Sequence, residues 1–219
     1  MKTVNPKTGI LPEAQQWLWP KLSSIGRNFV LYGGTAVALR YGHRQSVDFD
    51  FFTHRPFDPD ELKSNLDWLG DSQTLQVAAN TLAALVQTPP GEVKCSFFGG
   101  LSFGRIASPS VCVGTTVQIA SPLDLSVQKL KVIQVRSESK DYHDLDCLFR
   151  NGVSLEESVG AALALYPDFP TAVALRALCY FDDGDVATIP EAMKQRLRTL
   201  AAEFSGERPM RRESLLLGN

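Results

Sequence analysis

The sequence predicts an α+β protein, with a small mixed β-sheet core flanked by helices and followed by an all-helical C-terminal region. Short runs with strand-like alternation of apolar and polar residues occur only before residue 122. After Pro122, apolar residues recur at the three-to-four spacing of helices. We therefore divide the 219 residues into a core at 1–121, a helical part at 122–205 and a tail at 206–219. The tail has no clear signal, and disorder is one interpretation of it.

The individual elements follow from local pattern, caps and breakers. In the first half we expect helices at 12–25 (ended or interrupted near Pro20), 35–42 (capped by Thr35) and 58–70, with strands at 28–32, 46–53, 74–80, 82–88 and 92–99. Further strands are expected at 111–114 and 116–121, and then helices at 122–136, 140–152, 154–165, 171–180 and 190–204.

Composition narrows the class of protein. The chain is 44% hydrophobic and 21% charged, as in ordinary globular proteins, and its net charge of -2 gives no whole-protein attraction for nucleic acid. An RNA partner would need a local basic surface. The four cysteines form no CxxC pair, which indicates reduced thiols. Because no signal peptide or membrane-length apolar run is present, we expect a cytoplasmic protein with no membrane partner.

The clearest functional pattern is LYGGTAVALRYGHRQSVDFDFF, residues 31–52. On a strand, Asp48 and Asp50 point to the same side with their Cα atoms about 7 Å apart. Two carboxylates among apolar residues are costly to bury, and a shared Mg²⁺ would remove that cost. Upstream, Gly33 and Gly34 form a turn in which phosphate oxygens can approach backbone N–H groups at a helix N-terminus. An exposed strand that happens to carry two Asp, after a plain strand-to-helix turn, remains the alternative.

This string resembles the AbiEii/AbiGii group of toxin-type nucleotidyltransferases, within the polymerase-β-like nucleotidyltransferase superfamily. SPLDLSVQKLKVI and KDYHDLDCLF resemble two later motifs of the group, in the expected order, with Lys140 in place of the more usual Arg. The resemblance implies a nucleotidyltransferase core, Mg²⁺ as cofactor and an NTP as substrate. It also implies a bacterial toxin–antitoxin or phage-defence role with a cognate antitoxin.

The resemblance also implies roles for particular residues. It assigns Asp48, Asp50 and Lys129 as catalytic; Gly33, Gly34, Thr35, Arg44 and Lys129 as nucleotide-binding; Asp48 and Asp50 as metal ligands; and His43, Ser96, Asp124 and Asp144 as supporting residues. Lys129 would stabilise the charge of the departing pyrophosphate.

Several of these residues have plainer alternatives. Arg44 could pair with Asp48 or Asp50 in the free protein, and Lys129 could be an exposed helical lysine. A solvated helix face is the plainer interpretation of Asp141 and Asp144. Otherwise we expect Asp124 and Asp144 to orient Lys129 or to bond the helical part to the core.

One position departs from the superfamily pattern. A third carboxylate usually comes from a neighbouring strand, and here that position falls on Ser96, which is neither an anion nor a competent base. Three interpretations follow: a third acid comes from elsewhere, two carboxylates suffice, or the protein is impaired. The favoured function is transfer of a nucleoside monophosphate to a hydroxyl of RNA, for example a tRNA 3′ end, or of a protein. The alternative is a fold that binds nucleotide or a protein partner without transfer.

Overall fold

A mixed eight-stranded sheet forms one layer of the molecule in the computed structural model, which describes residues 2–218. The strands are β1 (Thr3–Val4), β2 (Val30–Tyr32), β3 (Asp48–Phe52), β4 (Gln73–Ala78), β5 (Thr81–Thr88), β6 (Gly91–Phe98), β7 (Ser110–Cys112) and β8 (Gln118–Ile119). Their spatial order is β1-β7-β8-β2-β3-β6-β5-β4. The central strand β3 pairs antiparallel with β2 and parallel with β6.

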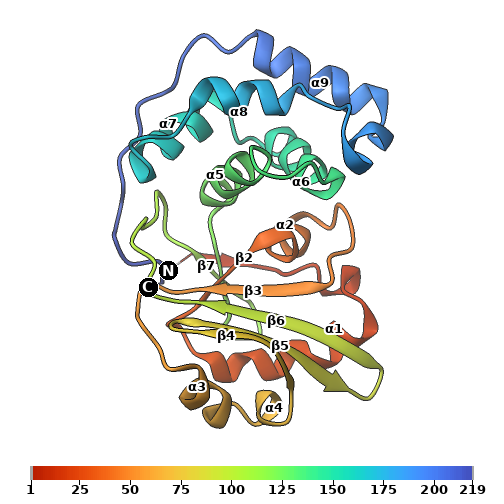
Figure 1. Ribbon diagram of the computed structural model, residues 1–219, viewed down its shortest axis with the longest axis vertical. Coiled ribbons are helices and arrows are strands. Elements are labelled where there is room, and N and C mark those ends of the chain that lie inside the picture. Colours follow the sequence, from red (N-terminus) through yellow and green to blue (C-terminus); the bar gives the residue numbers. More distant parts are fainter. Residues whose placement is uncertain (1, 219) are drawn as a thin grey trace.

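Helices cover both faces of this sheet (Figure 1). The α-helices are α1 (Glu13–Leu18), α2 (Gly33–Tyr41), α3 (Pro59–Asn65), α4 (Asp67–Gly70), α5 (Pro122–Val132), α6 (Ser139–Arg150), α7 (Leu155–Leu165), α8 (Thr171–Leu178) and α9 (Glu191–Ala202). Short 3₁₀ helices are η1 (Thr8–Ile10), η2 (Trp19–Ile25) and η3 (Gly184–Thr188). Helices α1 and α4 lie on one face, and α2 lies on the other beneath α5 and α6. Helices α7, α8 and α9 form the outermost layer.

The predicted fold class is confirmed, with local differences that have physical causes. The predicted helix at 12–25 is α1 followed by the 3₁₀ helix η2, because Pro20 has no N–H to continue an α-helix. The predicted helix at 58–70 is two helices, since Leu66 adopts an extended backbone and buries its side chain. Strand β1 was not predicted, because a strand of two residues is too short to show a periodic pattern.

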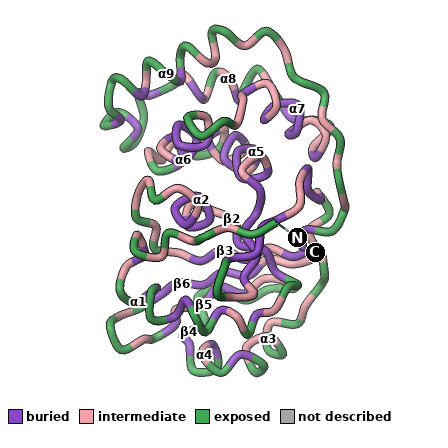
Figure 2. Tube along the Cα trace, turned by 180° about the vertical axis from the view of Figure 1, so that it is seen from behind, coloured by how far each residue is buried: buried purple, intermediate pink, exposed green. Residues whose placement is uncertain are grey.

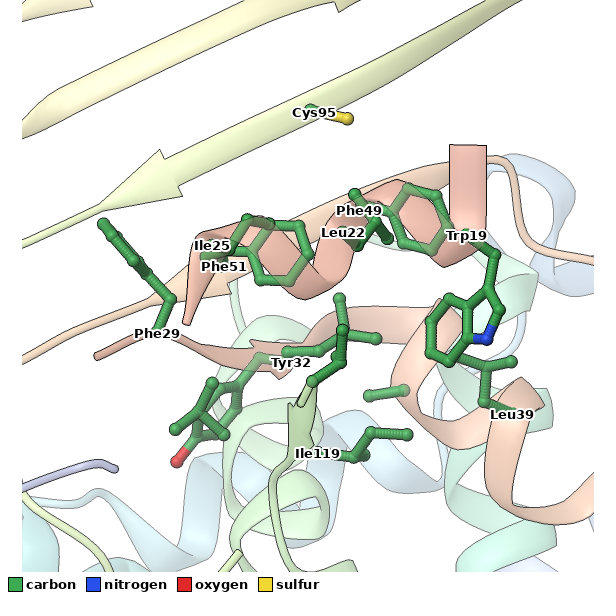
Figure 3. Packing of buried hydrophobic residues seen from close by; sticks show 14 of the residues in the cluster. Trp19, Leu22, Ile25, Phe29, Tyr32, Leu39, Phe49, Phe51, Cys95 and Ile119 are labelled. Atoms are coloured by element: carbon green, nitrogen blue, oxygen red, sulfur yellow. The ribbon is translucent and has the colours of Figure 1, made fainter. Parts of the chain in front are cut away.

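Aromatic packing fixes the orientation of β3. The rings of Phe49 and Phe51 are fully buried, and Phe51 stacks on Phe97 of β6 at 5.3 Å between ring centroids. Figure 3 shows both rings among buried side chains that include Trp19 and Leu22 of η2. Because side chains alternate along a strand, Asp48 and Asp50 must point to the opposite face, toward α2 and α5.

The buried residues form two hydrophobic clusters that meet at α5. Leu125 belongs to the cluster around the sheet, whereas Val127 belongs to the cluster among α5 to α9. Figure 2 shows buried residues along α2, α5 and the central strands, with exposed residues concentrated on outer elements such as α9. A boundary after residue 121 therefore remains a prediction, because α5 contributes to both clusters. No helix within residues 2–218 has the length and apolar character needed to cross a membrane.

Residues 206–218, which sequence left unassigned, form an extended C-terminal strap. The strap leaves α9 and returns along one side of the molecule to the level of the sheet (Figure 1). The Arg208 N–H donates to the carbonyl of Glu156 on α7. At the other end, the buried Arg105 guanidinium donates to the carbonyls of Leu216 and Gly218. The strap thus joins the helical part to the core.

Substitution of Gly160 tests this strap. A Cβ at position 160 would overlap the backbone oxygen of Arg208, so we expect Gly160→Ala to detach the strap from α7. Trypsin should then cleave within the strap about tenfold faster than in the wild type. Global melting is a poor readout, since alanine also favours helix by about 1 kcal/mol. Gly70→Ala is the matched control, because no atom lies within 4 Å of its added Cβ. Equal cleavage rates for all three proteins would contradict the contact.

Candidate active site

A cavity of about 370 Å³ lies between the sheet and α5, at the N-terminus of α2. Its size lies in the range of small-molecule sites. Lining residues that carry chemistry are Gly33 and Gly34 of α2, Arg44, Asp48 and Asp50 of β3, Lys94 of β6, Gln128 and Lys129 of α5, Arg136 and Lys140. The structure therefore brings the predicted glycines, carboxylates and lysine together from three separate elements.

Neither glycine of the turn leaves room for a side chain in this arrangement. Gly33 has φ of +73°, and a Cβ there would lie 2.6 Å from Oδ2 of Asp50. A Cβ on Gly34 would overlap the guanidinium of Arg44. Helix α2 begins at Gly33 with no side-chain cap, so the N–H groups of its first turn are left for an anion.

Thr35 does not cap the helix as predicted. The helix starts two residues earlier, with Tyr32 at the N-cap position, and the buried Thr35 hydroxyl donates to the carbonyl of Asp48. This bond ties the first turn of α2 to β3, and thereby fixes the distance between the glycine turn and the carboxylates.

Asp48 and Asp50 have no ion-pair partner within residues 2–218. Burial raises the pKa of Asp50, and the charge of Asp48 raises it further. Lys94, the Ser96 hydroxyl as a hydrogen-bond donor and Lys129 act in the opposite direction. A half-buried carboxylate pair that has no cation within ion-pair distance in the described residues and faces a cavity fits a hard divalent cation.

Asp144 of α6 is the centre of a buried ionic network. Its oxygens accept from His43 Nε2 at 2.7 Å and from Arg44 Nε and Nη2 at 2.7 and 2.8 Å. Lys129 Nζ of α5 approaches the same carboxylate at 2.5 Å. Burial alone would raise the pKa of Asp144, but the His43 hydrogen bond, the Lys129 charge and Arg44 together hold it well below its usual range. One carboxylate thus fixes a loop of the core to two helices.

This network corrects three of the alternatives drawn from the sequence. Arg44 pairs with Asp144 and not with Asp48 or Asp50. Asp141 and Asp144 are fully buried, so they do not form a solvated helix face. Lys129 is 6% exposed and binds Asp141 at 2.6 Å, so it is not a surface lysine.

Asp124 binds the core and not Lys129. Its carboxylate accepts from the backbone N–H groups of Ile106 and Ala107 and from the Ser121 hydroxyl. It therefore anchors the start of α5 to the loop before β7, which is the second of the two roles expected for it.

Ser96 lies beside Asp50, in the register that strand parity predicted. Strand β6 runs parallel to β3, with Asp50 opposite Ser96 and Asp48 opposite Lys94. Among residues 2–218, no group of three or more His, Cys, Asp or Glu side chains is placed to hold a metal ion. A third acid from another element is thus not found in this part of the chain.

Lys94, Arg136 and Lys140 line the cavity but were not assigned site roles from the sequence. Lys94 shares strand parity with Ser96, so the signal for its orientation was present. Arg136 comes from the turn after α5 and binds Asp141 at 2.9 Å, a contact that local pattern does not predict.

Comparison with known proteins shows the family of the chain. The family profile described as "Nucleotidyl transferase AbiEii toxin, Type IV TA system" matches residues 21–215. The chain belongs to the AbiEii family. A type IV toxin–antitoxin system implies a cognate antitoxin partner.

Two proteins are similar to this chain. An uncharacterized protein of Aquifex aeolicus, aq_aa25, is 32% identical over 178 residues, which are 79% of this chain and 84% of that protein. The crystal structure of an antigenic nucleotidyltransferase-like protein from Paracoccidioides brasiliensis aligns with a TM-score of 0.52 at 19% identity, over 82% of this chain and 89% of that one. The second likeness shows a nucleotidyltransferase-like fold.

Asp144→Asn should strongly destabilise this AbiEii protein. The variant leaves Lys129 and Arg44 buried beside a neutral partner, so we expect a loss of about 3–5 kcal/mol in the free energy of unfolding at pH 7. Because the folded pKa of Asp144 is lowered, its contribution is complete above the unfolded pKa of about 3.9 and is lost as pH falls further. Urea unfolding at several pH values measures this difference. The exposed Asp182→Asn is the control. Equal free energies of unfolding at pH 7 for wild type and both variants would contradict a stabilising role for Asp144.

In contrast to Asp144→Asn, we expect Asp50→Asn to stabilise the protein at pH 7 when metal has been removed with a chelator. The folded pKa of Asp50 is raised, so the stabilisation it gives when protonated is complete below about pH 3.9 and is lost as pH rises. The variant should therefore unfold at a higher temperature than wild type at pH 7, and this advantage should disappear near pH 3.5. Thermal unfolding monitored by circular dichroism, again with Asp182→Asn as control, measures the difference. A variant with a lower melting temperature than wild type at pH 7 would show that the ionised Asp50 does not destabilise the fold.

Proposed function

We propose that this AbiEii protein transfers a nucleoside monophosphate from an NTP to a hydroxyl of RNA, such as a tRNA 3′ end, in a reaction that requires Mg²⁺. The observation that carries the proposal is the cavity itself. Within about 370 Å³ it brings together two carboxylates that have no ion-pair partner in the described residues, a helix N-terminus that begins with two glycines, and the buried Lys129. The antitoxin of the system would control this activity.

Each group has a part suited to its position. The first-turn N–H groups of α2, at Gly33 and Gly34, would bind phosphate oxygens of the NTP. Asp48 and Asp50 would hold Mg²⁺, which neutralises phosphate charge when bound. Lys129, which binds Asp141 and Asp144, would face the charge that develops on the leaving pyrophosphate.

The charges at the cavity balance in the protein alone: Arg44, Lys94, Lys129, Arg136 and Lys140 stand against Asp48, Asp50, Asp141, Asp144 and Glu138. A divalent cation at Asp48 and Asp50 would neutralise that pair and leave two positive charges in excess. A cavity of this sign favours an anionic ligand such as a triphosphate.

A protein that binds nucleotide without transferring it is the second candidate. Ser96 favours it, because the site lacks the third carboxylate that often acts as the base. The two candidates predict the same nucleotide binding and differ only in transfer.

Transfer is tested with each α-³²P-labelled NTP, Mg²⁺ and total RNA. We expect wild type to label RNA and Asp48→Asn to label it at least about 100-fold more slowly, since the variant loses a ligand of the metal. Asp182→Asn should match wild type. Growth arrest on expression should likewise require Asp48.

The outcomes separate the candidates. A wild-type protein that binds an NTP but labels no RNA would favour the binding module, and labelled protein in place of RNA would reassign the acceptor. If Asp48→Asn labelled RNA as fast as wild type, the carboxylate pair would not be the catalytic centre.

A further inference from the structure

Lys94 differs from the other cations of the cavity. Within residues 2–218, each of the others has a carboxylate within ion-pair distance: Arg44 has Asp144, Lys129 has Asp141 and Asp144, Arg136 has Asp141 and Glu138, and Lys140 has Glu138. Lys94 lines the same cavity, is exposed, and has no such partner in that part of the chain. Its charge is therefore available to a ligand.

The sheet order places Lys94 on a defined side of the carboxylates. Strand β3 lies between β2, which leads into the glycine turn, and β6, which carries Lys94. Lys94 is directly opposite Asp48 in the parallel pairing, and Ser96 is opposite Asp50. The carboxylate pair thus has the helix N-terminus on one side and Lys94 on the other.

The chemistry of phosphoryl transfer gives these two sides different roles. The attacking oxygen and the leaving group lie roughly in line on opposite sides of the phosphorus. If the pyrophosphate rests on Gly33 and Gly34, the acceptor hydroxyl must approach from the β6 side. Lys94 is the charged residue of β6 that lines the cavity there.

The residues on the β6 side of the cavity suit an acceptor that carries a phosphate. A carboxylate at position 96 would repel a phosphate, whereas Ser96 is neutral and Lys94 attracts it. The whole chain has a net charge of -2, so an RNA strand needs a local cation close to its reacting end. A protein serine or threonine hydroxyl carries no neighbouring phosphate for Lys94 to bind.

We propose that Lys94 binds a backbone phosphate near the end of the RNA acceptor and so positions the terminal hydroxyl at the carboxylate pair. The proposal rests on the transfer function proposed above and adds to it a residue that distinguishes acceptor from NTP. Lys94 acts on the acceptor, while Gly33, Gly34 and Lys129 act on the triphosphate.

The test compares Lys94→Gln with Lys94→Arg, and uses the exposed Lys7→Gln as a matched control outside the cavity. The probe is a fluorescent single-stranded oligoribonucleotide with a free 3′ hydroxyl. Its binding is measured by anisotropy at several salt concentrations, with Mg²⁺ and saturating α,β-non-hydrolysable NTP analogues. Binding of the analogues is measured separately.

We expect Lys94→Gln to weaken oligoribonucleotide binding about tenfold and to reduce the salt slope of the logarithmic plot by about 0.7, as for one lost phosphate contact on a single strand. Affinity for the NTP analogues should stay within about twofold, because Lys94 does not touch the triphosphate side. Lys94→Arg should restore most of the binding, and Lys7→Gln should match wild type.

Several results would overturn the assignment. These are an unchanged salt slope, an equal loss of NTP-analogue affinity, no oligoribonucleotide binding by wild type, or equal displacement by poly-glutamate, which would indicate an acidic protein instead. Lys94-dependent binding without any labelling of RNA would leave the assignment standing and refute the transfer function.

Discussion

The buried carboxylate of Asp144 is the constraint on which the candidate site depends. It binds His43 and Arg44 from the loop after α2, and Lys129 from α5, so it fixes the distance across the cavity. Burying these charges costs several kcal/mol per ion, and only near-complete hydrogen bonding offsets that cost. The bidentate contact from Arg44 supplies the geometry that a single contact would lack. The spacing between the loop after α2 and helix α5, which sets the width of the cavity, is therefore fixed.

The same network determines which charges remain free. Because Asp141 and Asp144 satisfy Arg44, Lys129 and Arg136, none of these cations is drawn to Asp48 or Asp50. The carboxylate pair then faces the cavity without an ion-pair partner in the described residues, and burial, followed by the charge of Asp48, raises the pKa of Asp50. A divalent cation would neutralise the charge of this pair. Pairing the protein's own cations elsewhere thus leaves the carboxylate pair free for the divalent cation that we propose.

Sequence pattern predicted the parts of this site that depend on local order. The alternation of Asp48, Phe49, Asp50 and Phe51 was sufficient to place both carboxylates on one face, and strand parity placed Ser96 beside them. Sequence pattern did not predict contacts between residues that lie far apart in the chain. Arg44 and Asp144 are 100 residues apart, and two nearer carboxylates offered Arg44 an equally plausible partner. Thr35 was misassigned because a threonine after two glycines has the local signature of a cap, whereas its hydroxyl binds β3.

Ser96 and Lys94 are best understood as one feature of β6. A third carboxylate at position 96 would lie beside Asp50, whose pKa burial and Asp48 already raise, and it would demand further positive charge. The Ser96 hydroxyl instead donates to Asp50 and eases that strain, while the charge of Lys94 acts on Asp50 in the same direction. The β6 side of the site is consequently neutral to positive, where three acids would make it strongly negative. Such a surface matches an anionic acceptor better than a second metal ion.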